Sequence, residues 1–209
     1  MNEIKSAEQV KNTENLAVYI DWCGLVVKKE TLGIISEVLR IPYDSKRPRE
    51  GFYSVGCPSV RFLESKHEYG IHMIGEGCRG FERYLRSQGI EWNTFFKRML
   101  EYDVEIRNID LAIDDQKKVY NISGLIERAK KGMINQKIMV DYDGYIDEKI
   151  VTLGSFQSSL LVKFYENNFR NRYEFKFLGK QATNVVQEII KGNDLLSIAE
   201  KFLHDVFPK

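Results

Sequence analysis

Hydrophobic and polar residues alternate along several short segments of the chain, and this period of two is typical of β-strands with one buried face. The clearest segments are residues 16–27, 104–115, 160–165 and 172–178. In the last of them, aromatic residues at 173, 175 and 177 alternate with Arg172, Glu174 and Lys176. Because successive side chains of a strand point to opposite faces, the pattern predicts a sheet with one apolar and one charged face.

The rest of the pattern adds helices and further strands. Apolar residues recur at helical spacing in 30–40, 81–87, 92–100, 121–131, 181–191 and 195–207. Additional strands are expected at 52–55, 60–63, 70–74 and 149–154, and a turn at 141–145. We therefore expect an α+β fold with a large, mainly antiparallel sheet, helices packed on one face and a polar site on the other. Residues 1–15 are expected to be a flexible tail, and residues 16–209 a single domain.

Composition and charge limit how the chain could bind nucleic acid. With 43% hydrophobic and 29% charged residues, the chain is typical of a soluble globular protein, and its formal net charge is only +1. Nucleic-acid binding would therefore require a local basic patch. The candidates are the loop 41–50, with Lys46, Arg47 and Arg49, and the glycine-rich turn 75–80, with Arg79. The loop can equally be a solvated connector, and the turn a steric requirement between strand and helix.

The cysteines and the absence of apolar runs indicate a cytoplasmic protein. Cys23, Cys57 and Cys78 form no Cys-x-x-Cys pair, which favours buried thiols in a reducing compartment over a zinc site. The three histidines have no metal-ligand spacing. Neither a signal peptide nor an apolar run of about 18 residues occurs, so we expect no membrane association.

The candidate chemistry lies on the polar face of the predicted sheet. Asp110 faces the same way as Glu174 if their strands share one core, and Lys163, Tyr165 and Arg172 accompany them. Carboxylates, a phenol and cations together suit a metal-assisted reaction at phosphate. Asp114 is roughly 13 Å along the strand from Asp110, so Glu174 is the better metal partner, and Asp114 and Asp115 are interpreted as strand-end turn residues. Alternatively, Asp110 simply faces solvent.

Five segments in a fixed order resemble the replication initiation factor family, which comprises trans-acting rolling-circle plasmid replication initiators and related conjugative-element relaxases. The segments are Ile20-Asp21-Trp22, residues 72–82 and 109–115, residues 153–158 followed by 163–166, and residues 172–175. The resemblance covers roughly residues 16 to 185.

The resemblance implies a metal-dependent nicking-joining endonuclease acting on single-stranded origin DNA. A tyrosine attacks the phosphodiester, and we assign this role to Tyr165, with Lys163 and Arg172 neutralising the phosphate. Asp110 and Glu174 would bind Mg²⁺ or Mn²⁺. DNA contacts are expected from the following residues: Lys46, Arg47, Arg49, Arg79 and Lys176. A helicase and a second copy of the chain are candidate partners.

Two departures from the family pattern leave an alternative open. The family often has tyrosine where this chain has Thr152, and arginine where it has Asn108. An alcohol is much less acidic than a phenol, so a nucleophile at position 152 would be lost. The alternative functions are therefore a DNA-binding module without chemistry and a regulatory protein acting through protein contacts.

Overall fold

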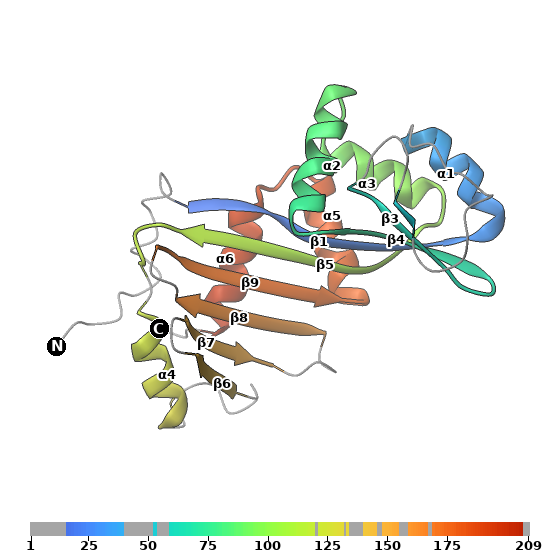
Figure 1. Ribbon diagram of the computed structural model, residues 1–209. Helices are drawn as coiled ribbons and strands as arrows, with labels where there is room; N and C mark the ends of the chain where they lie inside the picture. The colour runs from blue at the N-terminus through green and yellow to red at the C-terminus, as the bar shows by residue number, and fades with distance from the viewer. Residues whose placement is uncertain are drawn as a thin grey trace. The chain divides into compact units, whose positions relative to one another are not determined.

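The computed structural model describes residues 16–39, 52–53, 59–119, 121–131, 133, 140–145, 148–154, 159–166 and 169–206. The predicted tail and the basic loop fall outside these residues. Within the described residues, nine strands form one sheet in the order β2-β3-β4-β1-β5-β9-β8-β7-β6. Figure 1 labels these strands with the exception of β2. Every pairing whose register is established is antiparallel: β1 with β4, β2 with β3, β3 with β4, β6 with β7, and β7 with β8. The predicted α+β class with a large antiparallel sheet is confirmed.

The elements largely follow the predicted segments. The strands are β1 (Leu16–Lys28), β2 (Phe52–Tyr53), β3 (Arg61–Glu64), β4 (Glu68–Ile74), β5 (Glu105–Asp115), β6 (Val140–Tyr145), β7 (Glu148–Leu153), β8 (Leu160–Glu166) and β9 (Asn171–Leu178). The helices are α1 (Leu32–Leu39), α2 (Glu76–Ser87), α3 (Trp92–Glu101), α4 (Ile122–Lys130), α5 (Lys180–Ile190) and α6 (Leu195–Val206), with a short 3-10 turn at Lys29–Thr31.

One predicted turn and one predicted helix start are wrong. Residues 140–145 form strand β6 instead of a turn, because pairing along its whole length with β7 supplies backbone hydrogen bonds that outweigh a turn-like Asp-Gly sequence. Helix α2 begins at Glu76, five residues earlier than predicted, so Gly77 and Gly80 lie inside it. A β-carbon at Gly80 would lie 2.0 Å from the hydroxyl of Ser59, so this close packing explains a glycine in the helix.

The chain divides into two compact units. The first unit consists of Met1–Tyr19, Leu111–Lys176 and Asp194–Lys209, and the second of Ile20–Asp110 and Phe177–Asn193. In the first unit, α4 packs on β7 and β8. In the second unit, α2 packs on β4, and α3 contacts α1, α2 and α5. Each unit therefore has helices packed against its own elements.

The core of the second unit is rich in aromatic rings. Phe81 lies 5.1 Å from Phe95 and 5.5 Å from Trp92, measured between ring centroids, and Phe96 stacks on Trp92. All four side chains are buried, so they fix α2 against α3. Within the described part of the chain, no helix combines the length and the hydropathy that a membrane crossing requires.

Candidate functional site

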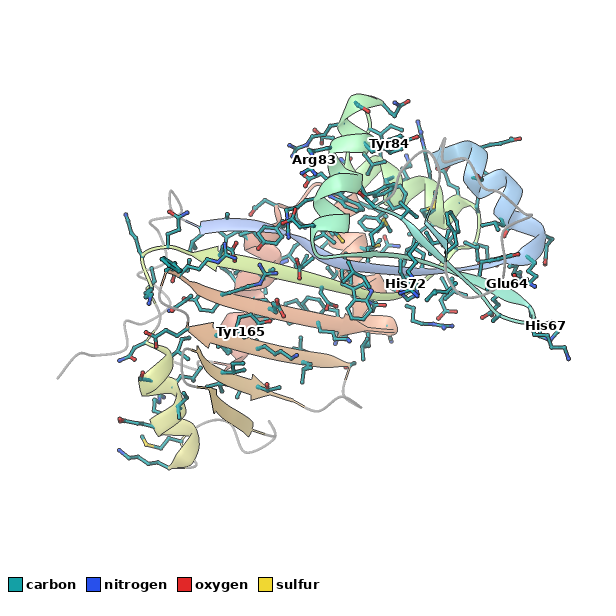
Figure 2. The ribbon with its side chains drawn as sticks, in the orientation of Figure 1. Glu64, His67, His72, Arg83, Tyr84 and Tyr165 are labelled. Carbon is teal, nitrogen blue, oxygen red and sulfur yellow. The ribbon has the colours of Figure 1, made fainter. Side chains whose placement is uncertain are left out.

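The sheet of the first unit carries a polar face that begins on β7 and β8. Thr152 lies opposite Lys163 in the antiparallel register, and Ile150 lies opposite Tyr165. Residues paired in this way project to the same face, so Tyr165 is the diagonal neighbour of Thr152. All four side chains are partly exposed, and Figure 2 labels Tyr165 on its strand.

Strand β9 adds Arg172 and Glu174 to this polar face. The rings of Phe164 and Tyr173 pack together on the buried face, with their centroids 5.5 Å apart. Because side chains alternate along each strand, the residues flanking these two rings point the opposite way. Lys163, Arg172 and Glu174 therefore lie on the same face of the sheet as Tyr165.

Arg172 is the centre of a charged network on the polar face. Its Nε lies 2.8 Å from Oε1 of Glu174, and its Nη1 lies 3.2 Å from Oδ1 of Asp114. The same Nη1 also donates a hydrogen bond to the hydroxyl of Tyr19. The guanidinium is thus shared between two carboxylates and a phenol, with only 15% of the side chain exposed. Its positive charge is already compensated before any ligand binds.

Tyr19 is a functional candidate that the sequence did not reveal. Its hydroxyl donates a hydrogen bond of 2.8 Å to Oδ2 of Asp114, and the guanidinium of Arg172 lies 5.3 Å from its ring centroid. Arg170 also contacts Oδ2 of Asp114, at 2.8 Å. A phenol beside a carboxylate and a guanidinium has both a proton acceptor and a cation that stabilises developing negative charge.

The adjacent carboxylates Asp114 and Asp115 have different roles. Asp115 is fully buried and accepts hydrogen bonds from the hydroxyl of Tyr173 at 2.5 Å and from the backbone amides of Lys117 and Val119. This confirms the interpretation of Asp115 as a strand-end turn residue. For Asp114 that interpretation is wrong, because its side chain belongs to the Arg172 network on the polar face.

The two predicted metal ligands come from different units of the chain. Asp110 belongs to the second unit and Glu174 to the first, so this pair stays a prediction. Among the described residues, no group of three or more acidic, histidine or cysteine side chains is arranged to hold a metal ion. Within the first unit, Arg172 already binds one oxygen each of Asp114 and Glu174. As arranged, these carboxylates fit an arginine better than a divalent ion.

The predicted DNA-contacting residues are only partly within the described chain. Three fall outside it: Lys46, Arg47 and Arg49. Arg79 lies 3.3 Å from Asp21 and 2.8 Å from Glu76, so two carboxylates hold its guanidinium. Lys176 is partly exposed on β9. The contacts of Arg79 position helix α2 against β1, and a DNA contact at these residues stays a prediction.

The second unit contains two buried free thiols, as the sequence predicted. Burial raises the pKa of the Cys23 thiol well above its ordinary value, and the nearby Cys78 and Asp110 raise it further. Burial also raises the pKa of Cys78, and Asp21 adds to this effect. The Cys78 thiol donates a hydrogen bond of 3.1 Å to the carbonyl of Met73. Both cysteines are therefore neutral structural groups and poor nucleophiles. Cys57 lies outside the described residues.

The two departures from the family pattern occupy different environments. Thr152 is partly exposed on the polar face, beside Lys163. Asn108 is buried, and its side chain lies over Gly24, where an added β-carbon would be 2.1 Å from Oδ1 of Asn108. Asn108 therefore serves packing between β1 and β5.

Sequence reasoning missed Tyr19, Asp114 and Arg170 for two reasons. Tyr19 and Arg172 are 153 residues apart, and no local pattern reveals which residues of two distant strands lie side by side. Arg170 precedes β9 and therefore lies outside the alternating pattern of that strand. The acidic end of the 104–115 segment was the only available signal.

Comparison with known proteins agrees with this fold. Residues 17–98 match the family model of the rolling circle replication initiation protein N-terminal domain. The chain is 28% identical over 204 residues to the putative DNA relaxase NicK of Bacillus subtilis (strain 168), and this match covers 82% of the chain and 58% of that relative. The chain thus spans less than two thirds of the relative's length.

The solved structure of a rolling circle replication initiator protein from Geobacillus stearothermophilus has the same fold. It superposes with a TM-score of 0.72 at 22% identity, over 91% of this chain and 85% of that one. The family resemblance predicted from the sequence is therefore confirmed as a resemblance: residues 17–98 match the N-terminal domain of the rolling circle replication initiation protein family.

Proposed function

We propose that this chain nicks and rejoins single-stranded DNA at a replication or transfer origin. The names of its relatives, a DNA relaxase and a rolling circle replication initiator, support this class of reaction. The observation that carries the proposal is the hydrogen bond of the Tyr19 phenol to Asp114 beside Arg172, on a face that also holds Tyr165 and Lys163. A phenol, an acceptor for its proton and several cations are the groups that a tyrosine nuclease requires.

The proposed reaction transfers a phosphoryl group from DNA to tyrosine. The phenol oxygen forms a bond to phosphorus, the bond from phosphorus to the 3′ oxygen breaks, and the 3′ oxygen takes up a proton from water. When Tyr19 is the nucleophile, its proton passes to Asp114, and the 5′ phosphate remains linked to the enzyme. Attack by a 3′ hydroxyl on this linkage reverses the step and rejoins the strand.

Two tyrosines of the polar face qualify as the nucleophile. Tyr165 is the residue that the sequence predicts, and it lies diagonally across from Thr152, the position at which the family resemblance implies a tyrosine. Tyr19 is favoured by its contacts, because Asp114 can accept its proton and Arg172 can stabilise the phenolate. Lys163 lies two residues before Tyr165 on the same face, where it can neutralise a bound phosphate.

A divalent metal stays an expectation drawn from the family resemblance. Mg²⁺ or Mn²⁺ would polarise the scissile phosphate. Because Arg172 already contacts Asp114 and Glu174, no step of the proposed reaction passes through a metal. Assays with Mn²⁺ and with a chelator will show whether an ion is required.

The test measures covalent attachment of single-stranded origin DNA to the full chain. Wild-type protein, Tyr19→Phe, Tyr165→Phe and the double variant are each incubated with 3′-labelled oligonucleotide and Mn²⁺, because the fragment 3′ of the nick is the one that stays linked to the protein. We expect a stable adduct with wild type, loss of the adduct in one single variant, and none in the double variant. Tyr84→Phe, on helix α2, is a matched control that should keep the adduct. An adduct that persists in the double variant would refute the assignment.

The second candidate function is DNA binding without cleavage, favoured by Thr152 at the position of the family tyrosine. It predicts salt-sensitive DNA binding and no nicking with any metal. The adduct assay separates the two functions directly, because a binding module yields no adduct while still retarding the oligonucleotide.

A further inference from the structure

The sheet of the second unit has one face buried beneath helices and one face with aromatic and basic groups. In the pairing of β1 with β4, Cys23 lies opposite Met73 and Leu25 opposite Ile71, and all four are buried. The alternate positions place Trp22 opposite Ile74 and Gly24 opposite His72. We call the residues Trp22, His72, Ile74 and Arg61 the Trp22 face.

The Trp22 face combines two partly exposed aromatic rings with an exposed apolar side chain. Trp22 and His72 are partly exposed, with their ring centroids 6.4 Å apart and their planes inclined at 53°. Ile74 is 50% exposed, which is unusual for an isoleucine within a strand. Exposed aromatic and apolar side chains that adjoin on a sheet indicate a binding surface. Figure 2 labels His72 on β4.

Gly70 leaves room on β4 for the imidazole of His72. An added β-carbon at Gly70 would lie 3.0 Å from Nε2 of His72, so the imidazole extends over the glycine. No side chain at position 70 competes for this space. The imidazole therefore lies over Gly70, with its ring centroid 6.4 Å from that of Trp22.

Cations border the Trp22 face. Arg61 lies directly opposite His72 in the pairing of β3 with β4, it is exposed, and no carboxylate within the described part of the chain forms an ion pair with it. Arg107 is 56% exposed, and its nearest carboxylates, Glu105 and Glu68, are 3.6 and 3.9 Å away. Such exposed, long pairs contribute little, so both guanidinium groups can bind an anion.

The protonation of His72 fits a stacking role. Partial burial lowers the pKa of His72, and the charges of Arg107 and Arg61 lower it further. The imidazole is therefore neutral at pH 7 and offers an aromatic face, while the two arginines supply the positive charge.

We propose that the Trp22 face binds unpaired bases of single-stranded DNA, which stack on Trp22 and His72 while Arg61 and Arg107 contact the phosphates. Aromatic rings on a sheet with adjacent cations are a general way to hold single strands, because every base has a stacking face and every nucleotide a phosphate. Duplex DNA hides its base faces within the helix, so the unpaired form is the ligand. The inference rests on the proposed function only for the choice of DNA as the nucleic acid.

The experiment uses tryptophan fluorescence of the full chain with an oligothymidylate. The sequence has two tryptophans, and Trp92 is buried in the aromatic core, so Trp22 is the reporter. We expect the oligonucleotide to quench the emission of wild type and to leave that of Trp22→Phe unchanged. Trp22→Ala should bind about tenfold more weakly. Arg61→Ala should lower the slope of log affinity against log salt by about 0.7.

Further variants guard against loss of folding and non-specific effects. Ile74→Ser changes an exposed side chain, so it should remain folded and bind several-fold more weakly. Tyr102→Ala alters an aromatic residue that is 36% exposed at the end of α3, outside the Trp22 face, and should bind like wild type. Unchanged affinity in Trp22→Ala and Ile74→Ser, or equal affinity for a duplex, would overturn the inference.

The same samples distinguish this inference from the proposed function. Quenching without covalent cleavage would mean that the Trp22 face binds DNA and the nicking proposal is wrong. Cleavage without any quenching would mean that nicking is correct and DNA binds elsewhere.

Discussion

The two units of the chain expose different chemistry on their sheets. The first unit places the charged groups Asp114, Arg172 and Glu174 around the phenol of Tyr19, and this network is mostly shielded from solvent. The second unit has the partly exposed Trp22 beside the exposed Ile74, and its carboxylate Asp21 pairs with Arg79. Charged networks suit bond breaking, whereas aromatic surfaces suit retention of a flexible strand.

We infer from this difference that the first unit cleaves DNA and the second unit binds it, and substitutions can test this assignment. Changes in the Arg172 network should affect cleavage more than binding, and changes on the Trp22 face should affect binding more than cleavage. The buried groups beneath each surface should affect stability instead, and the predictions below run from the largest expected effect to the smallest.

The largest effect is expected from Asp114→Asn. The amide cannot accept the phenol proton of Tyr19, so adduct formation with single-stranded DNA should fall about a thousandfold, within the range for loss of a general base. Oligonucleotide affinity should stay within about twofold of wild type. Glu82→Gln, in an exposed pair with Arg86 on α2, is the matched carboxylate control and should cleave normally. Equal loss of binding and cleavage in Asp114→Asn would remove the contrast between the units.

Asp115→Ala should destabilise the fold, because Asp115 has a structural role and no proposed role in cleavage. Its removal leaves the hydroxyl of Tyr173 and the backbone amides of Lys117 and Val119 without their acceptor in a buried position. We expect the free energy of unfolding to fall by about 3 kcal/mol. Urea denaturation measures this, with Asp115→Asn expected to cost less because its amide oxygen still accepts. A loss below about 1 kcal/mol would mean that these hydrogen bonds are replaced by water.

Gly24→Ala tests the packing of Asn108 on β1. The new β-carbon would lie 2.1 Å from Oδ1 of Asn108, so the side chain must move, and we expect a loss of roughly 2 kcal/mol of stability. Adding Asn108→Ala should restore part of this loss, because the clash disappears. Strictly additive losses in the double variant would show that the two residues do not contact each other.

The smallest effect concerns the pH dependence contributed by Cys23 and Cys78. Both thiols have folded-state pKa values raised by burial, so the folded protein keeps protons that the unfolded chain releases above about pH 8.5. Their contribution to stability is therefore full at neutral pH and falls as the pH rises into the alkaline range. The urea midpoint should decrease from pH 8 to pH 10 in wild type and less steeply in Cys23→Ala/Cys78→Ala. Identical pH dependence of the urea midpoint in the two proteins would show that folding does not raise the pKa values of the thiols.

Local patterns predicted the strands but not how their side chains meet. Residues 172–178 were predicted correctly because their alternation of aromatic and charged residues matches a half-buried strand. Residues 140–145 were predicted wrongly because pairing with β7, a tertiary contact, outweighs their turn-like composition. The placement of Tyr19 beside Arg172 depends on strand register across 153 residues, which no window of sequence contains.

The most direct test of the nicking proposal identifies the residue that becomes linked to DNA. Single-stranded origin DNA is incubated with the full chain, the adduct is digested with trypsin and nuclease, and the modified peptide is sequenced by mass spectrometry. We predict a nucleotide on a tyrosine of the polar face, either Tyr19 or Tyr165, and loss of that peptide after its substitution by phenylalanine. A nucleotide on any other residue, or strand cleavage without any linked peptide, would contradict the proposal.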